Sequence, residues 1–227
     1  MIEKINLNNI LFLDIETVPE YHNYRGLDSE TQQLWEQKTQ YQRKDEVSAE
    51  DFYERAGIWA EFGKIITISV GYFVNKGDIR NFRVTSFWGE EKKILNDFSN
   101  LLNTHFNGAQ HVLCGHNAKE FDIPFIARRM IINGIALPNK LNLFGKKPWE
   151  VPHLDTLELW KFGDYKHFTS LKLLTKVLGI PSPKHDIDGS EVAHVFYVEN
   201  DIDRIITYCE KDVIAVAQIF LRLRRED

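Results

Sequence analysis

The sequence predicts an α/β fold built on a mixed central sheet that carries helices on both faces. Apolar, strand-like runs alternate along the chain with segments of helical periodicity, and two consecutive runs share a tight turn. The expected order is a strand, an insertion, two strands, a helix, a strand and further helices. Such an order combines parallel and antiparallel pairs within one sheet.

Three apolar segments in the first half of the chain are expected to form strands. Residues 9–15, NILFLDI, have the composition of a buried strand, and residues 64–74 and 79–87 follow as the second and third. The sequence NKGD at 75–78 lies between the last two and favours a tight hairpin turn. The second and third strands are therefore predicted to be antiparallel neighbours.

From residue 90 onward, apolar residues recur mostly at helical spacing. Residues 111–117 are expected to form a short buried strand between two of these helices. Gly134 and Gly179 are expected to stop two of the helices, and Thr169 or Ser170 is expected to cap one. The predicted helices span residues 90–106, 119–135, 168–180 and 201–225.

Residues 21–58 differ from the rest of the chain and are expected to form a helical insertion between the first two strands. They are rich in charged residues and poor in aliphatic ones. Ser29 and Ser48 fit as N-caps of two short helices. The insertion either covers a functional site or is a solvated elaboration, and the second interpretation is favoured. Residues 1–227 are expected to form a single domain.

Composition and charge narrow the possible functions. The 227 residues carry a net charge of −5, so the chain lacks the basic footprint of a protein that coats DNA non-specifically. An enzyme that contacts nucleic acid through a local patch remains compatible with this charge. Cys114 and Cys209 have neither metal-site spacing nor a disulfide framework, which favours a cytoplasmic location. No signal-peptide pattern or membrane-length apolar run is found, so no membrane association is expected.

Asp14 and Glu16 stand where the first strand is expected to end. Residues i and i+2 of a strand point to the same face, about 6.6 Å apart, so both side chains can reach one point. Two converging carboxylates repel each other unless a cation lies between them, and a hard divalent ion prefers oxygen ligands. A capped turn that faces water is the alternative, and these two residues alone do not exclude it.

Two further acids occupy comparable edges of the predicted elements. Asp122 falls near the start of a helix, where a carboxylate also stabilises the helix dipole. Asn117 fits as the N-cap of that helix, and Phe121 fits in the core. Tyr208 and Asp212 lie four residues apart and share one face of the terminal helix. A Tyr–Asp hydrogen bond inside the core would explain this last pair in purely structural terms.

Taken in order, the three motifs resemble those of the DEDD superfamily of 3′→5′ exonucleases, in its tyrosine-bearing subgroup. FLDIET resembles the first exonuclease motif, GHNAKEFDIPFI the second and YCEKDV the third. The second motif is particularly similar to that of the proofreading domains of family B DNA polymerases. The resemblance covers residues 10–216 and implies a ribonuclease-H-like mixed sheet. The histidine-bearing subgroup would have a His at the position of Thr207, so the tyrosine pattern fits better.

This resemblance implies a site with two divalent ions, Mg²⁺ or Mn²⁺, held by four carboxylates. By the family pattern Asp14 bridges both ions, while Glu16 and Asp212 bind the ion on the nucleophile side. Asp122 acts on the other ion, directly or through water. Tyr208 orients the attacking water, because a phenol with an ordinary pKa of about 10 is a poor base at neutral pH.

The implied substrate is the 3′ end of single-stranded nucleic acid, with DNA favoured over RNA and nucleoside 5′-monophosphates as products. Asn117 and Phe121 would lie against the terminal nucleotides, and backbone groups around Ile15 and Thr17 would hold the 3′ hydroxyl. Residues 140–184 contain eight lysines and four acids, which indicates either phosphate contacts or a solvated face. The lysines considered for phosphate contacts are Lys146, Lys147, Lys166 and Lys172.

Other polar residues are assigned structural roles. Asp155 is expected to cap a helix rather than to bind a metal ion. One of the adjacent Arg128 and Arg129 is expected to face solvent or to form a structural ion pair. The histidines show no helical zinc spacing.

Two alternative functions stay open. One is an exoribonuclease or a short-oligonucleotide hydrolase, and the other is a catalytically idle nucleic-acid-binding module of the same fold. These residues contain no recognisable polymerase segment, so the chain is expected to act alone or with a partner protein.

Overall fold

Five strands form one mixed sheet in the computed structural model of the chain. The residues described are 2–43, 47–77, 79–164, 166–181 and 187–226. The strands span Ile10–Pro19 (β1), Gly63–Lys76 (β2), Ile79–Trp88 (β3), Val112–Gly115 (β4) and Leu154–Asp155 (β5). Their order in the sheet is β3-β2-β1-β4-β5. The β1–β2 and β2–β3 pairs are antiparallel, and the β1–β4 and β4–β5 pairs are parallel.

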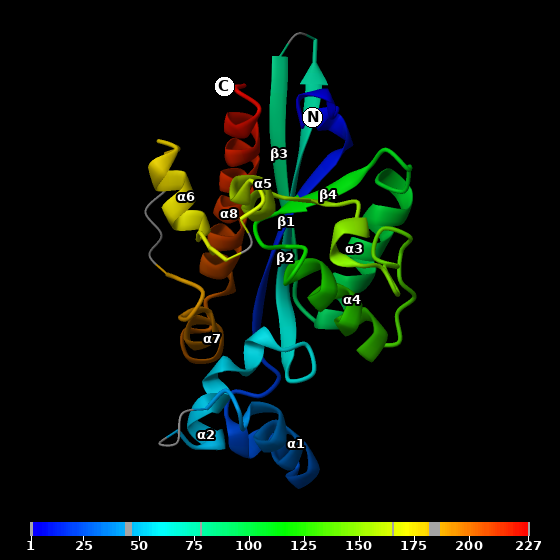
Figure 1. Ribbon diagram of the computed structural model, residues 1–227. Helices are drawn as coiled ribbons and strands as arrows, with labels where there is room; N and C mark the ends of the chain where they lie inside the picture. Colours follow the sequence, from blue (N-terminus) through cyan, green and yellow to red (C-terminus); the bar gives the residue numbers. More distant parts are fainter. Residues whose placement is uncertain (1, 44–46, 78, 165, 182–186, 227) are drawn as a thin grey trace.

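Helices cover both faces of this sheet. The longer helices span Ser29–Thr39 (α1), Glu91–His105 (α3), Asp122–Ile132 (α4) and Ile202–Leu223 (α8). Shorter ones span Ala49–Phe52 (α2), Thr156–Lys161 (α5), Leu171–Val177 (α6) and Val192–His194 (α7). A 3₁₀ helix spans Tyr53–Ile58 (η4), and a π-helical turn spans Val195–Glu199 (η6). Figure 1 shows α3 and α4 on one side of the sheet and α6, α7 and α8 on the other.

None of the helices in the described residues combines the length and the apolar character that crossing a lipid bilayer requires.

β1 lies between two hydrophobic cores because its side chains alternate between the faces of the sheet. Leu11, Leu13 and Ile15 pack in a core with residues of α3 and α4. Ile10 and Phe12 pack in a second core with residues of α8. A strand buried on both faces is apolar at nearly every position, which explains the run at the start of β1. The even-numbered positions of β1 therefore face α8.

The hairpin between β2 and β3 confirms the predicted antiparallel pair. Lys76 is paired with Ile79, so a two-residue connection joins the strands. Gly77 in this connection has a φ of 62°, a left-handed conformation that glycine adopts without steric cost. Asp78, the last residue of the predicted turn, lies outside the described residues.

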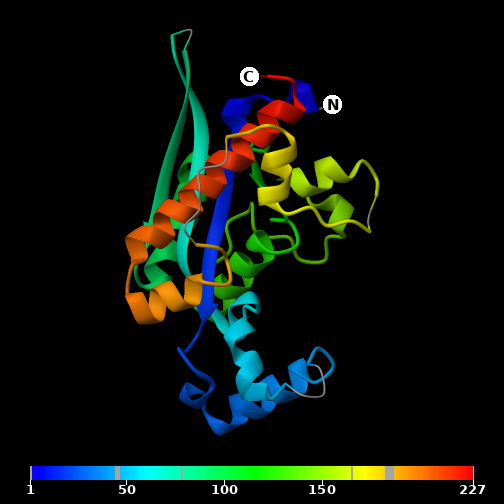
Figure 2. The same cartoon turned by 90° about the vertical axis from the view of Figure 1, so that its left-hand side faces the viewer.

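The insertion is helical as predicted, but its first cap differs. The carboxylate of Asp28, rather than the hydroxyl of Ser29, caps α1 and accepts a hydrogen bond from the Thr31 N–H at 3.0 Å. Ser48 caps α2 as expected. The insertion lies beyond one end of β1, at the opposite end of the molecule from the two termini (Figure 2). Its own small core contains Leu27, Trp35, Phe52, Tyr53, Ala56 and Phe62.

The predicted helices of the second half are all present. α4 begins later than expected, with Phe121 in the N-cap position, so the structural alternative in which Asn117 caps this helix does not hold. Ser170 caps α6. Gly134 and Gly179 adopt left-handed conformations just beyond α4 and α6, where such residues end helices.

Candidate active site

β1 continues past both of its acids instead of ending beside them. The strand extends to Pro19, beyond the predicted end at residue 15, so Asp14 and Glu16 lie within it. β4 pairs with β1 only as far as Phe12, which leaves the following part of that edge open. The β1–β2 register shifts directly after Glu16, and such bulges are frequent next to functional sites. Both acids thus lie just beyond the carboxyl end of a parallel neighbour, where α/β sheets commonly bind ligands.

Asp14 meets α8 through Cys209. The Cys209 Sγ lies 3.4 Å from the Asp14 main-chain oxygen and 3.4 Å from its Oδ2. Cys209 is fully buried, Glu16 is buried and Asp14 is partly exposed. Ligand atoms of these three residues all lie within 4.8 Å of one another. α8 therefore holds the Asp14 carboxylate close to that of Glu16.

Asp122 joins the same group from the opposite side of β1. It is the first residue of α4 and is 3% exposed. Its Oδ1 accepts a hydrogen bond from the main-chain N–H of Ile15 at 3.1 Å. Ile15 lies between the two acids of β1, so the Asp122 carboxylate adjoins both of them.

Tyr208 and Asp212 complete the group from α8. Their side chains are hydrogen-bonded to each other. Both line a pocket of about 440 Å³ together with Ser170 and Lys172 at the start of α6. The negative charge of Asp212 contributes to the raised pKa of Glu16, which agrees with its place beside the β1 acids.

The environment of this site disfavours negative charge. Burial, followed by the charges of Asp122, Glu16 and Asp212, raises the pKa of Asp14 well above its usual range. Burial also raises the pKa of Asp122 to about 7 and that of Asp212 to about 6. Burial, then Asp212 and Asp122, likewise raises the pKa of Glu16. Carboxylates so placed ionise readily only when a positive charge is supplied.

The described residues supply no such charge to three of these acids. Within the described residues, no lysine, arginine or histidine forms an ion pair with Asp14, Glu16 or Asp122. Convergent carboxylate oxygens are the donors that hard divalent cations prefer. The site therefore fits a divalent metal ion on the chemistry of its donors.

The residues predicted to bind substrate fall into two groups. Ile15, Thr17 and Phe121 line a second pocket of about 840 Å³ that also reaches Glu16. The N–H of Ile15 is already donated to Asp122, and the Thr17 hydroxyl donates to the Gly57 carbonyl oxygen at 2.7 Å. These two donors are therefore engaged within the protein.

Asn117 does not line either of the pockets that contain the acids. It has a φ of 63°, and its N–H donates to the Asp155 carboxylate at 2.9 Å. Asp155 caps α5 as predicted, accepting from the N–H of Leu157, and it also accepts from the N–H of Lys119. Asp155 thus shapes the loop between β4 and α4.

The basic residues considered in the sequence analysis lie in different parts of the structure. Lys172 lines the smaller pocket beside Tyr208 and Asp212. The Lys147 ammonium lies 5.4 Å from the centre of the Trp149 ring, on an exposed loop. Arg128 is exposed, whereas Arg129 is buried and forms structural ion pairs, as was expected of one of the two.

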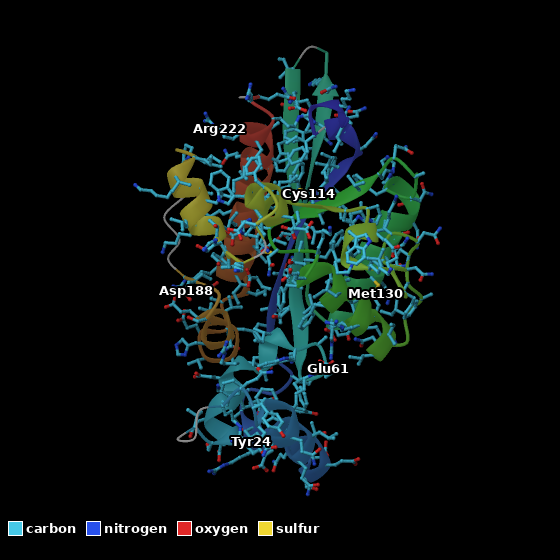
Figure 3. All side chains as sticks on the ribbon, in the orientation of Figure 1. Tyr24, Glu61, Cys114, Met130, Asp188 and Arg222 are labelled. Carbon is cyan, nitrogen blue, oxygen red and sulfur yellow. The ribbon has the colours of Figure 1, made fainter. Side chains whose placement is uncertain are left out.

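Residues that sequence reasoning missed come from two places. Cys209 contacts Asp14, but a Cys inside an amphipathic helix carries no signal that separates it from ordinary core residues. His22 and Arg55 of the insertion line the larger pocket. Figure 3 shows Tyr24 in the insertion, beyond the end of the sheet. It also shows Asp188 and Met130 on opposite sides of the sheet.

Comparison with known proteins shows that most of the chain matches one protein family. The family described as "predicted 3'-5' exonuclease related to the exonuclease domain of PolB" matches residues 58–226. This range contains Asp122, Tyr208 and Asp212 but begins after β1 and its two acids. No curated protein matches the chain.

The fold is similar to that of a solved family B DNA polymerase from the hyperthermophilic archaeon Pyrobaculum calidifontis, with a TM-score of 0.61 and 15% sequence identity. The similarity covers 94% of this chain and 24% of the polymerase. At this identity it shows the fold, a ribonuclease-H-like mixed sheet as predicted. Since the family match spans most of its length, the chain belongs to the family of predicted 3′–5′ exonucleases related to the exonuclease domain of PolB.

Proposed function

We propose that this chain is a metal-dependent 3′→5′ exonuclease that releases nucleoside 5′-monophosphates from single-stranded nucleic acid, with DNA favoured over RNA. The observation that carries the proposal is the convergence of Asp14, Glu16, Asp122 and Asp212 from three elements. Three of these acids have no ion-pair partner within the described residues. Burial raises their pKa values, so a bound cation would be needed to hold them ionised. Family membership supports the reaction class.

The four carboxylates would hold two divalent ions, Mg²⁺ or Mn²⁺. Bound there, the ions would supply the positive charge that stabilises the attacking and leaving oxygens of the phosphodiester. Asp14 lies close to Glu16 and Cys209, and the charge of Asp122 contributes to its raised pKa. This central position suits the assigned role of Asp14 as the ligand shared by both ions.

Tyr208 would orient the attacking water rather than remove its proton. Burial, followed by the negative charges of Asp212, Glu16 and Asp14, raises the pKa of Tyr208 well above its usual range. The phenol therefore stays protonated at neutral pH and acts through hydrogen bonding. Its bond to Asp212 fixes the ring beside the carboxylates.

The larger pocket would receive the 3′-terminal nucleotide. Phe121 offers an aromatic wall, and stacking on such a wall tolerates every base because each base has a π face. Thr17 and Ile15 form the floor next to Glu16. Asn117 would act indirectly, through the loop that positions Phe121.

The proposal is tested by following degradation of oligonucleotides labelled at the 5′ end. Single-stranded DNA and RNA of the same sequence are incubated with the protein in Mg²⁺, in Mn²⁺ and in EDTA. We expect stepwise shortening from the 3′ end and mononucleotide release, both abolished by EDTA. Faster loss of RNA would make the chain an exoribonuclease, and no loss in either metal would favour an idle binding module.

A matched pair of variants locates the reaction. Asp212→Asn is expected to lower degradation roughly 10³-fold or more, because it removes a charged ligand from the site. Asp203→Asn makes the same change at an exposed position in the first turn of the same helix and should leave the rate unchanged. Full activity in Asp212→Asn, with normal circular dichroism in both variants, would contradict the site assignment.

A further inference from the structure

The insertion provides the outer wall of the larger pocket. β1 supplies the floor, Phe121 one side, and the segment around α7 another side. Figure 1 shows α7 and the insertion flanking the end of β1. The insertion residues that line the pocket are His22, Glu54, Arg55, Gly57 and Ile58. The family match begins at residue 58, so this wall lies almost entirely outside the matched region.

The wall is fixed to the floor by close backbone packing. A Cβ atom on Gly57 would lie 3.1 Å from the Cα and the carbonyl carbon of Val18, closer than side chains normally approach a backbone. The Thr17 hydroxyl donates to the Gly57 carbonyl oxygen at 2.7 Å. η4 therefore rests directly on β1, only one residue away from Glu16.

The wall is also supported from behind. Trp35 is fully buried in the core of the insertion, and its Nε1–H donates to the Ala49 carbonyl oxygen at 2.8 Å. The Trp35 ring packs edge to face against Tyr53, the first residue of η4.

Arg55 places a cation on this wall. Its guanidinium lies 5.3 Å from the centre of the Phe52 ring and its side chain is exposed. Within the described residues Arg55 forms no ion pair, including none with its neighbour Glu54, whereas Arg25 of the same insertion pairs with Glu50 at 2.9 Å.

His22 lies on the same wall and is held by stacking. Its ring packs on that of Tyr197, with the centres 5.0 Å apart and the planes 17° from parallel. The Tyr197 hydroxyl in turn donates to the Pro19 carbonyl oxygen at 2.6 Å. Arg55 and His22 thus line the same pocket as Glu16.

We propose that Arg55, assisted by His22, binds a phosphate of the single strand whose 3′ end lies in this pocket, so that the insertion determines how tightly single-stranded ends are held. This inference rests on the proposed function for the identity of the ligand. A guanidinium held on an aromatic face and without an ion pair suits a phosphate, which accepts two parallel hydrogen bonds. The carboxylates and their ions would position the scissile bond, while the insertion binds the strand.

The test measures binding in the Asp212→Asn background, where the strand survives. Fluorescence anisotropy follows a labelled single-stranded DNA 8-mer in Mg²⁺ at several salt concentrations. Arg55→Gln is expected to weaken binding about tenfold, as for loss of a charge-assisted hydrogen bond. The slope of log Kd against log salt should fall by about 0.7, the value for one phosphate contact on a single strand.

Two matched variants complete the design. Lys38→Gln removes a positive charge near the exposed end of α1 in the same insertion, outside the pocket lining, and should leave both the affinity and the salt slope unchanged. Glu54→Gln removes a negative charge from the pocket wall and should tighten binding, the opposite sign to Arg55→Gln.

Equal weakening by Lys38→Gln and Arg55→Gln, or an unchanged salt slope in Arg55→Gln, would overturn the inference. Degradation by the chain with its natural Asp212 is assayed in parallel on the same 8-mer. If the chain degrades the 8-mer but Arg55→Gln binds it as tightly as before, only the role of the insertion is rejected. Absence of degradation together with a lost phosphate contact in Arg55→Gln would reject the proposed reaction and retain the binding wall.

Discussion

Two groups of carboxylates in this molecule meet very different surroundings. Around Arg129, the guanidinium lies 2.5 Å from Glu91 and 3.0 Å from Glu20, and it also donates to the Ala60 carbonyl oxygen. Around β1, no basic residue of the described chain pairs with Asp14, Glu16 or Asp122. The fold therefore supplies a cation where charge has a structural role. Around β1, the metal ions of the proposed function would compensate the charge.

The largest expected effect comes from breaking the first group. Arg129→Met leaves the largely buried Glu91 without its cation, and we expect a loss of about 3–5 kcal/mol in the free energy of unfolding. Arg128→Met makes the same change at the adjacent, exposed residue and should cost less than about 0.5 kcal/mol. Urea unfolding measures both. Similar losses in the two variants would remove the contrast on which the comparison rests.

The second group of carboxylates should make the stability of the fold depend on pH, in a direction that follows from their raised pKa values. The pKa of Asp122 is raised to about 7 and that of Asp212 to about 6, whereas both have a pKa of 3.8 when unperturbed. The folded state therefore binds more protons than the unfolded state between pH 4 and pH 7. The stabilisation is full below the unperturbed pKa and is lost as pH rises through the folded values.

In EDTA, the free energy of unfolding is accordingly expected to decrease as the pH rises from 5 to 8, by on the order of 1 kcal/mol or more, and the urea midpoint should decrease with it. Mn²⁺ should raise the midpoint more at pH 8 than at pH 5, because ionised carboxylates bind the ion. Asp14→Asn should flatten both dependences by removing one of the repelling charges. A midpoint in EDTA that rose with pH would contradict the account of this site.

A smaller effect is expected at Cys209, whose Sγ contacts two oxygen atoms of Asp14. Cys209→Ala removes the contacts of Sγ with the Asp14 oxygens and should lower kcat several-fold, with a higher Mn²⁺ concentration needed for half activation. Cys114→Ala deletes the other buried thiol, in β4, and should affect stability alone. Equal kinetic effects in the two variants would make Cys209 an ordinary core residue.

The sequence allowed four of the five strands and the longer helices to be predicted, and the four acids to be chosen as candidates, because these depend on local patterns and on an ordered set of motifs. The two-residue strand β5 was missed because so short a segment has no alternation to detect. The end of β1 was misjudged because Asp and Glu have low strand propensity, whereas the open edge beyond β4 accepts them. The cap of α1 was missed because Asp28 and Ser29 are equally good N-caps in adjacent positions.

Pairings between distant residues were beyond local reasoning. Arg129 pairs with Glu20, 109 residues away, and with Glu91, 38 residues away, so no spacing rule connects them. The place of Arg55 in the pocket that Glu16 also lines likewise depends on how η4 packs on β1. The residue type of Asn117 also fits an N-cap, yet its left-handed backbone lies in a turn ahead of α4.

The hydrogen bond from the Ile15 N–H to Asp122 gives the site a natural reporter. This amide proton is donated to a carboxylate instead of a neighbouring strand, so its NMR chemical shift should follow the ionisation of Asp122. Its exchange with solvent deuterium should slow when a cation draws the surrounding groups together. One backbone signal would thus give the order of metal loading and proton release at atomic resolution, in the absence of any substrate.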